Sequence, residues 1–305
     1  MSRETRPLDI RGRRFVLGPR TWLMGVLNVT PDSFSDGGRY FDAGKAVARG
    51  LELAAEGADI LDVGGESTRP GSLPVPEAEE LRRVVPVIEA LRKRTAILLS
   101  VDTTKAAVAR AALDAGADIV NDTSAFRFDP AMAGEVARSG AGVILMHMKG
   151  TPLTMQDSPR YEDLLGEVGA FLDDRLRLAE ASGIPRERAI IDPGIGFGKT
   201  FEDNLVLLRR QEVFHALGRP LLLGFSRKAF LGRILGAPPA ERLEGTIAAA
   251  VLSVERGAHI LRVHDVGPVA RAVRSAEAML GLVPGTESSA RAEDASAARK
   301  ASDVR

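Results

Sequence analysis

The sequence predicts an α/β protein, a (β/α)8 barrel that forms a single domain over residues 1–284. One observation is a phrase that recurs. Residues 57–61 (GADIL) return as 116–120 (GADIV), as 257–261 (GAHIL) and, more loosely, as 140–144 (GAGVI). Each copy follows an Ala-rich amphipathic segment and opens an apolar run. The glycine therefore fits the residue just past a helix end, and the run fits a strand buried on both faces.

The second observation is that about eight short apolar segments alternate with segments of helical periodicity. Strands are expected near residues 22–28, 58–64, 96–102, 117–122, 142–147, 188–192, 220–225 and 259–264. Helical patterns lie between them, for example over residues 43–56, 76–93, 104–115 and 161–182. Eight such units favour a closed barrel over an open doubly wound sheet, which usually has fewer strands.

The two ends of the chain differ from the repeating middle. Residues 8–20 predict a β-hairpin, with its turn at 11–13, that would plug the barrel floor. Residues 285–305 are mostly Ser, Ala and charged residues with almost nothing to bury, so we expect a disordered tail. The remaining length agrees with the roughly 250 residues of a typical barrel.

Composition excludes several classes of protein. Lys and Arg total 41 and Asp and Glu total 41, so no overall charge attracts nucleic acid or an anionic membrane. The chain has no cysteine, which rules out disulfides, thiolate metal sites and a Cys nucleophile. Residues 1–14 lack an apolar signal core, and the apolar runs are too short to span a bilayer. We therefore expect a cytoplasmic protein without nucleic-acid or membrane partners.

Each predicted strand runs into polar or charged residues at its carboxyl end, where (β/α)8 barrels hold their active sites. These residues are Asn28, Asp62, Asp102, Asn121 with Asp122, His147, Asp192, residues 226–228 (SRK) and residues 262–264 (RVH). A single Asp or Asn after a strand is more often a helix cap or a turn residue. Their gathering at one end of the barrel favours a ligand site instead.

Three loops at the same end are rich in glycine. Residues 28–38 and 64–71 also contain proline and polar residues, and are either mobile lids or ordinary flexible loops. Residues 192–199 suggest a phosphate cradle, but they lack both the Walker spacing and the dinucleotide fingerprint.

Taken together, these segments resemble the dihydropteroate synthases, in order, from about residue 22 to 266. The resemblance is carried by residues 24–38 (MGVLNVTPDSFSDGG), 62–71 (DVGGESTRPG), 101–103 (VDT), 121–122 (ND), 146–148 (MHM), 150–152 (GTP), 192–199 (DPGIGFGK), 226–228 (SRK) and 262–265 (RVHD). One departure is Asp203, where the family more often has His before Asn204. Because that position opens a predicted helix, we expect little consequence.

The resemblance implies an enzyme that condenses 6-hydroxymethyl-7,8-dihydropterin pyrophosphate with 4-aminobenzoate, giving 7,8-dihydropteroate and pyrophosphate. It also implies Mg²⁺ as cofactor, a homodimer, and sulfonamide drugs that compete for the aminobenzoate site. The implied pterin-binding residues are Asp102, Asn121, Asp192, Lys228 and Arg262. Those for pyrophosphate are Asn28, Thr68, Arg69, Arg262 and His264, with Asn28 also the expected metal ligand. Those for aminobenzoate are Phe34, Thr68, Pro70, Phe197, Arg227 and Lys228.

The expected catalytic residues are Asp36, Asp102, Lys228, Arg262 and His264. Arg262 and His264 lie two apart on a strand, so both side chains point to one side, where they would bind pyrophosphate. Departure of pyrophosphate would leave a delocalised cation on the pterin methylene, which Asp36 and Asp102 would stabilise. No enzyme nucleophile is then required, which suits a chain without cysteine.

Two alternatives remain open at this point. A pterin-dependent methyltransferase on the same barrel would share Asp102, Asn121 and Asp192, but would not need Phe34 and Asp36 or the pair of Arg262 and His264. A non-catalytic pterin-binding paralogue would be expected to lose loop or anion-binding residues. His147 is more often a barrel-mouth residue with satisfied hydrogen bonds than a catalyst, and its role stays open.

Overall fold

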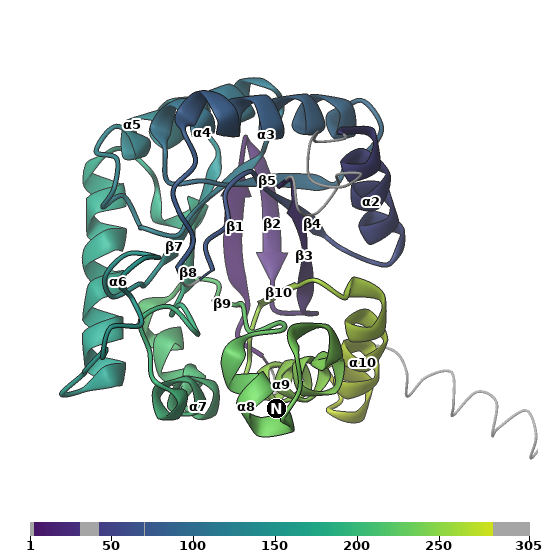
Figure 1. Ribbon diagram of the computed structural model, residues 1–305, viewed down its shortest axis with the longest axis vertical. Helices are drawn as coiled ribbons and strands as arrows, with labels where there is room; N and C mark the ends of the chain where they lie inside the picture. The colour runs from purple at the N-terminus through teal and green to yellow at the C-terminus, as the bar shows by residue number, and fades with distance from the viewer. Residues whose placement is uncertain (1–2, 31–42, 70, 283–305) are drawn as a thin grey trace, which may run out of the picture.

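The computed structural model describes residues 3–30, 43–69 and 71–282 of the chain. Within these ranges the predicted barrel and hairpin are confirmed, with helices packed around a central ring of strands (Figure 1). The predicted disordered tail at residues 285–305 lies outside the described residues, and so does the domain boundary at residue 284.

In the described part of the chain, eight parallel strands form the barrel. They are β3 (Trp22–Asn28), β4 (Ile60–Gly64), β5 (Leu98–Asp102), β6 (Ile119–Asp122), β7 (Gly142–Met146), β8 (Ala189–Asp192), β9 (Leu222–Leu223) and β10 (Ile260–Val263). Their order in the sheet is β8-β7-β6-β5-β4-β3-β10-β9, and a bridge between Ile191 and Leu221 joins its two edges. The strand predicted over residues 220–225 is shorter than expected, because only its middle pairs regularly with β10.

Helices follow the strands and cover the outside of the barrel (Figure 1). They are α2 (Ala43–Ala55), α3 (Glu77–Arg92), α4 (Ala106–Asp114), α5 (Met132–Ser139), α6 (Leu164–Ala181), α7 (Phe201–Arg209), α8 (Ala229–Leu235), α9 (Leu243–Glu255) and α10 (Val266–Met279), with short 3₁₀ turns η1 (Arg186–Arg188), η2 (Gln211–Leu217) and η3 (Pro239–Glu241). The repeated phrase marks helix ends as predicted: Gly140 caps α5 in the left-handed conformation, at φ 71°.

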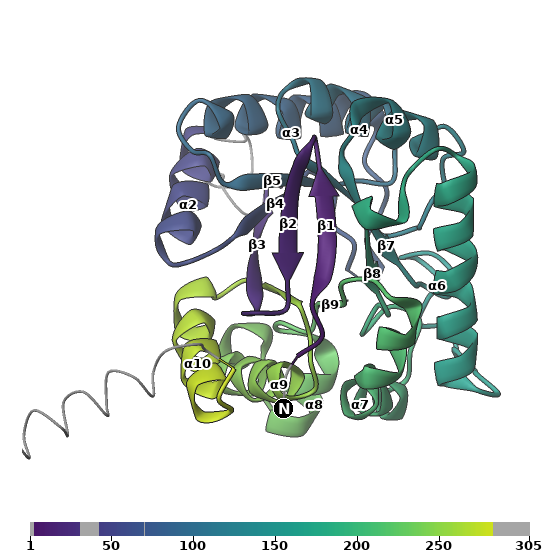
Figure 2. The ribbon, with the colours of Figure 1, turned by 180° about the vertical axis from the view of Figure 1, so that it is seen from behind.

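An apolar layer fills the barrel floor. Each barrel strand contributes one side chain, from Met24, Ile60, Leu98, Ile119, Ile144, Ile190, Leu222 and Ile260. The hairpin of β1 (Arg6–Ile10) and β2 (Arg13–Leu17) adds Leu8, Ile10 and Leu17, all fully buried. Figure 2 shows this hairpin lying across the end of the barrel. The hairpin therefore closes the floor, as the sequence predicts.

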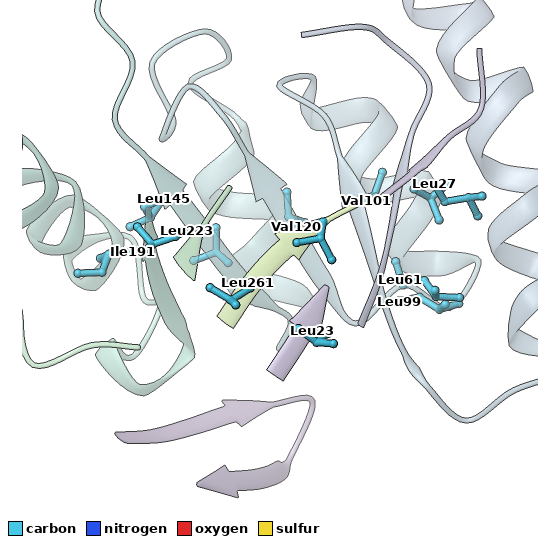
Figure 3. Close-up of a cluster of buried hydrophobic side chains, with 14 of the residues drawn as sticks. Leu23, Leu27, Leu61, Leu99, Val101, Val120, Leu145, Ile191, Leu223 and Leu261 are labelled. Atoms are coloured by element: carbon cyan, nitrogen blue, oxygen red, sulfur yellow. The ribbon is translucent and has the colours of Figure 1, made fainter. Parts of the chain in front are cut away.

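A second apolar layer lies between the strands and the helices. Alternate strand residues, among them Leu61, Leu99, Val120 and Leu261, point outward into it (Figure 3). Because each strand is buried on both faces, it reads as a nearly continuous apolar run in the sequence. These two layers fix the strands and leave their carboxyl ends to carry polar side chains.

Candidate active site

Polar side chains line the barrel interior immediately above the apolar floor. Side chains alternate along a strand, so Asp62 points inward two residues after the floor residue Ile60. The same step along the other strands gives a set of interior polar residues that we call the polar ring. Its members are Asp62 on β4, Asp102 on β5, Asn121 on β6, Asp192 on β8 and Arg262 on β10. All except Arg262 are at least nine-tenths buried.

Arg262 crosses the ring and binds two carboxylates. Its Nε lies 2.7 Å from Asp62 Oδ2, and its Nη2 lies 2.7 Å from Asp102 Oδ2. Asp62 Oδ2 also accepts a hydrogen bond from Asn121 Nδ2 at 3.0 Å. Among the described residues, the second oxygens of Asp62 and Asp102 are buried without a hydrogen-bond partner. Two carboxylates share one cation here, so the site holds uncompensated negative charge and unused acceptors.

The charge of Asp102 is therefore finely balanced. Burial raises the pKa of its carboxyl to about 7, although Arg262 opposes the rise. The neighbouring carboxylate of Asp62 adds to the rise by repulsion. A positively charged ligand or transition state beside Asp102 would favour its ionised form.

Asp192 and Lys228 form the opposite side of the mouth. Asp192 Oδ1 accepts a hydrogen bond from the backbone N–H of Gly194 at 2.7 Å, and Lys228 donates to the carbonyl of Ile195. The Lys228 Nζ also lies 4.3 Å from the centre of the Phe197 ring. Burial lowers the pKa of Lys228 to about 7, and Asp192 opposes this shift. Burial raises the pKa of Asp192 while Lys228 opposes the rise, so each stabilises the charge of the other.

Lys199 connects the glycine-rich loop at residues 193–198 to His147 through its side chain. This side chain is 2% exposed, and its Nζ lies 2.8 Å from His147 Nδ1 and 3.1 Å from the carbonyl oxygen of Phe197. Burial, followed by the charge of Lys199, lowers the pKa of His147 to about 2. His147 is therefore a neutral hydrogen-bonding partner within the loop support, which argues against a role as general acid. A Cβ on Gly194 would lie 1.9 Å from the carbonyl oxygen of His147, so the loop requires glycine there.

His264 follows the last residue of β10, and Arg227 lies in the segment after β9. His264 Nδ1 lies 3.1 Å from Ser226 Oγ, and burial together with Arg262 lowers the His264 pKa to about 3. Without an anion His264 is therefore neutral. Arg227 pairs with Asp265 through Nε at 2.9 Å and through Nη2. This pairing fixes the guanidinium at the rim of the mouth.

Contacts with two helices hold the loop after β4. Glu66 Oε2 accepts from the backbone N–H of Val75 at 2.8 Å and from Lys105 Nζ at 2.6 Å. Lys105 also bonds Glu80 of α3, at 2.5 Å. The loop carries Thr68 and Arg69, and Arg69 is close enough to His264 to help depress its pKa. The described part of the loop therefore lies near His264 at the mouth.

Asn28 offers a side-chain oxygen of the kind that Mg²⁺ prefers. Asn28 ends β3 beside Gly64, where a Cβ would lie 3.9 Å from Asn28 Oδ1 and 3.4 Å from the Asp102 Cβ. The glycine thus leaves space between these two side chains. Among the described residues, no group of three or more His, Asp or Glu side chains is placed to hold a metal ion. The residues present fit a metal that binds mainly through water and a ligand's phosphates.

The geometry agrees with comparisons to known proteins. The family model described as pterin binding enzyme matches residues 24–264. The dihydropteroate synthase of Synechocystis is 47% identical over 274 residues, which are 90% of this chain and 95% of that protein. The chain belongs to the dihydropteroate synthase family.

Two solved structures of dihydropteroate synthases are also similar to this chain. One, from Yersinia pestis in complex with a sulfonamide drug, has a TM-score of 0.85 at 43% identity and covers 90% of this chain and 99% of that one. The other, from Xanthomonas albilineans with 4-aminobenzoic acid, has a TM-score of 0.84 at 48% identity and covers 91% and 99%. As a member of this family the chain is an alkyl-transferring enzyme.

Most residues that the sequence singles out meet at the barrel mouth. Those that the structure places there are Asn28, Asp102, Asn121, Asp192, Phe197, Lys228, Arg262 and His264, with Arg69 and Arg227 at its edge and Thr68 next to Arg69 in the chain. Phe34, Asp36 and Pro70 lie outside the described residues. Phe197 is 9% exposed and packs with Met146, Met148 and Met155, with Lys228 Nζ 4.3 Å from the centre of its ring.

Three residues that organise this site have no role predicted from the sequence. Asp62 is predicted only as a strand end, although its position two residues after Ile60 places it inside the barrel. Lys199 lies in the glycine-rich motif and Lys105 in a predicted helix, and no contact is predicted for either. A lysine surrounded by glycine or small residues carries no signal of burial, so their contacts needed the structure.

Proposed function

We propose that this chain condenses 6-hydroxymethyl-7,8-dihydropterin pyrophosphate with 4-aminobenzoate, giving 7,8-dihydropteroate and pyrophosphate. The observation that carries the proposal is the polar ring, in which two buried carboxylates share Arg262 and keep unused acceptor oxygens. Buried unpaired acceptors suit a flat ligand edge that presents several N–H groups.

The pterin would lie across the polar ring. Asp192, with Asn121 and Asp102, would accept hydrogen bonds from its amino group and ring N–H. Lys228 would donate to the acceptor side of the ring, and Arg262 would stack against it or donate from its remaining N–H groups. Both charged forms are required here, since an un-ionised Asp102 accepts less and a neutral Lys228 donates less.

Pyrophosphate would bind at the rim next to His264. Arg262, Arg69 and Thr68 would donate to its oxygens together with His264, whose pKa would rise beside the anion. Mg²⁺, held by Asn28 and by pyrophosphate itself, would neutralise charge on the leaving group.

Aminobenzoate would occupy the outer part of the mouth. The expected slot comprises Phe34, Thr68, Pro70, Phe197, Arg227 and Lys228. The ring of Phe197 under Lys228 offers one apolar wall, and Lys228 or Arg227 would face the carboxylate of the substrate. The 4-aminobenzoic acid bound by the Xanthomonas enzyme and the sulfonamide bound by the Yersinia enzyme support this choice of ligand class.

The reaction would proceed by departure of pyrophosphate before attack. The bond between the pterin methylene carbon and the pyrophosphate oxygen breaks, and its electron pair leaves with pyrophosphate. Asp102, and Asp36 on the first loop, would stabilise the resulting cation. The aniline nitrogen then forms the new carbon–nitrogen bond and releases one proton.

Product analysis tests this function directly. The protein is mixed with the pterin pyrophosphate, 4-aminobenzoate and Mg²⁺, and dihydropteroate and pyrophosphate are measured. We expect both products in equal amounts. Methyl transfer from a reduced folate without pyrophosphate release would favour the methyltransferase alternative, and pterin binding without any product would favour the non-catalytic one.

The order of binding provides a second test. Aminobenzoate should bind weakly to the free protein and more tightly once pyrophosphate and Mg²⁺ are present, because they help to complete its slot. By linkage, aminobenzoate must then tighten pyrophosphate binding by the same factor. Calorimetric titrations with and without pyrophosphate measure this coupling, and equal affinities would contradict departure before attack.

The homodimer and the cytoplasmic location remain part of the proposal. Apolar side chains are exposed on α8, α9 and α10, where Ile234 is 55%, Leu252 47% and Met279 85% exposed. Light scattering on the full chain would measure the mass in solution. None of the helices in the described ranges is long and apolar enough to cross a membrane.

A further inference from the structure

Asp62 is the most deeply buried member of the polar ring that bears a charge. Its side chain is 0% exposed, so it lies beneath the surface that a ligand would meet. One oxygen, Oδ2, accepts from both Asn121 Nδ2 at 3.0 Å and Arg262 Nε at 2.7 Å. These donors come from β6 and β10, on either side of β4 in the barrel. Asp62 therefore connects two of the expected ligand-binding side chains without being exposed itself.

The fold does not require a carboxylate at this position. The other interior positions of this layer include Val26, Met146 and Gly224, so neutral side chains suffice for packing. The second oxygen of Asp62 is buried without a partner among the described residues. Buried ion pairs are often no more stabilising than apolar side chains of similar size. A buried charge that does not stabilise the fold usually belongs to a functional site.

We infer that Asp62 is a positioning residue that determines which hydrogen-bonding atoms Asn121 and Arg262 present to the pterin; this inference rests on the function proposed above. A carboxylate can only accept, so it takes the Nδ2 end of Asn121 and fixes the orientation of the amide. The carbonyl oxygen Oδ1 of Asn121 is then left as an acceptor for an N–H group of the ligand.

Asp62 fixes the guanidinium of Arg262 in the same way. Nε is bound by Asp62 and Nη2 by Asp102, so the plane of the group is set by two carboxylates. Nη1 and one hydrogen of Nη2 remain for a ligand, since a guanidinium has five N–H donors. The pattern offered to the ligand is therefore an acceptor from Asn121 and donors from one edge of Arg262.

Two substitutions at Asp62 separate hydrogen bonding from charge. Asp62→Leu removes the charge and both bonds, whereas Asp62→Asn removes the charge but keeps an oxygen that can accept from both donors. We expect Asp62→Leu to raise the Kd of the pterin pyrophosphate and its KM at least tenfold, and to leave the KM of aminobenzoate within about twofold. Asp62→Asn should recover at least half of the loss on a logarithmic scale. Equal Kd values for Asp62→Leu and the unmodified chain would overturn the inference.

Ser100→Ala is the matched control. Ser100 lies opposite Asp62 in the register of β4 and β5, is equally buried, and its Oγ has no hydrogen-bond partner in the described part of the chain. It is polar and in the same layer, but it bonds neither Asn121 nor Arg262. We expect its pterin affinity to stay within about twofold of the unmodified chain. If Ser100→Ala weakens pterin binding as much as Asp62→Leu, general disturbance of the layer explains both and the inference fails.

A readout without ligand keeps the inference separate from the proposed function. In nitrogen-15 NMR spectra of the free protein, the side-chain N–H groups of Asn121 and Arg262 should exchange slowly with water, and faster in Asp62→Leu. Unchanged exchange would overturn the positioning role. Absence of dihydropteroate from the unmodified chain would overturn the proposed function alone. If Asp62→Leu does not fold, Asp62→Ser replaces it, because a serine is too short to reach either donor.

Discussion

The floor and the mouth of this barrel are built on the same strands, two residues apart. Ile60 and Asp62 share one face of β4, and Ile260 and Arg262 share one face of β10. The floor is closed by the hairpin and all its side chains are apolar, so burial stabilises it directly. The mouth buries charges around Arg262 and leaves carboxylate oxygens unpaired. One end of the interior stabilises the fold, and the other gives up stability for a ligand.

The buried arginines at the two ends of the barrel also differ in their hydrogen-bond partners. At the floor, Arg219 is buried but donates Nε to the carbonyl of Ala189 and Nη2 to that of Pro7, so it ties the hairpin to the barrel. At the mouth, the partners of Arg262 among the described residues are side-chain carboxylates, and these retain unused acceptors. A buried arginine therefore indicates a site when its partners remain unsatisfied, and a structural tie when they do not.

The largest expected effect on kcat/KM comes from replacing Arg262, and not Arg219, by alanine. Arg262→Ala removes a donor for the leaving group and leaves Asp62 and Asp102 without their cation. We expect kcat/KM to fall about 1000-fold. Arg219→Ala is the matched control: its free energy of unfolding should fall, but kcat/KM per folded molecule should not. Steady-state kinetics and urea denaturation measure both, and similar kinetic losses in the two variants would contradict the division between floor and mouth.

The floor itself is tested by Ile10→Ala in the hairpin. Ile10 is fully buried in the floor layer, so its truncation leaves a cavity and should lower the free energy of unfolding by about 2–5 kcal/mol. Substrate binding should not change, because no polar ring residue contacts this layer through a hydrogen bond in the described structure. A changed KM for the pterin would show that the hairpin also shapes the mouth.

A third prediction concerns pH, to which the mouth responds and the apolar floor does not. The pKa values of Asp102 and Lys228 are both near 7, and the proposed roles need both charged. We expect kcat/KM to follow a narrow bell with its maximum near pH 7, falling below it as Asp102 is protonated and above it as Lys228 loses its proton. In Lys228→Arg the alkaline limb should move above about pH 9 while the acid limb stays. An unmoved alkaline limb would assign it to another group.

The contributions of the same two groups to stability change in opposite directions as the pH rises. The pKa of Asp102 is raised from 3.8, so its contribution to stability is present below about pH 3.8 and is lost as the pH rises through about 7. The pKa of Lys228 is lowered from 10.5, so its contribution is present above about pH 10.5 and is lost as the pH falls through about 7. At neutral pH both charges therefore oppose folding. Substrate that neutralises them should raise the Tm of the unmodified chain more than that of Lys228→Met.

The sequence predicts the barrel well because its information is local. A helix-ending glycine followed by a strand buried on both faces is visible in the repeated phrase, as at Gly116 before β6. The polar strand ends are also visible, since Asp192 and Arg262 interrupt apolar runs. Position alone therefore brings most of the expected site residues to one end of the barrel.

Contacts between distant segments could not be predicted in the same way. Lys199 meets His147 across 52 positions of sequence, and Asp62 meets Arg262 across 200. Which partner satisfies a buried charge depends on side-chain direction in three dimensions. The same limit applies to the neutral state of His264, because its low pKa results from burial beside Arg262.

The smallest expected effect lies at the start of α7, at Asp203, one departure from the family pattern. Thr200 and Asp203 form a capping box at the start of α7: Thr200 Oγ1 accepts from the Asp203 N–H at 3.1 Å, and Asp203 Oδ2 accepts from the Thr200 N–H at 2.9 Å. Asp203→His, the residue more frequent in the family, loses only the second bond. We expect the free energy of unfolding to fall by about 0.5–1 kcal/mol, with kcat/KM unchanged. Thr200→Ala, which loses the first bond, should cost a similar amount. Because α7 follows the loop that Lys199 supports, a kinetic effect of Asp203→His beyond about twofold would show that this cap also positions the glycine-rich loop, and that the mouth extends further than the polar ring.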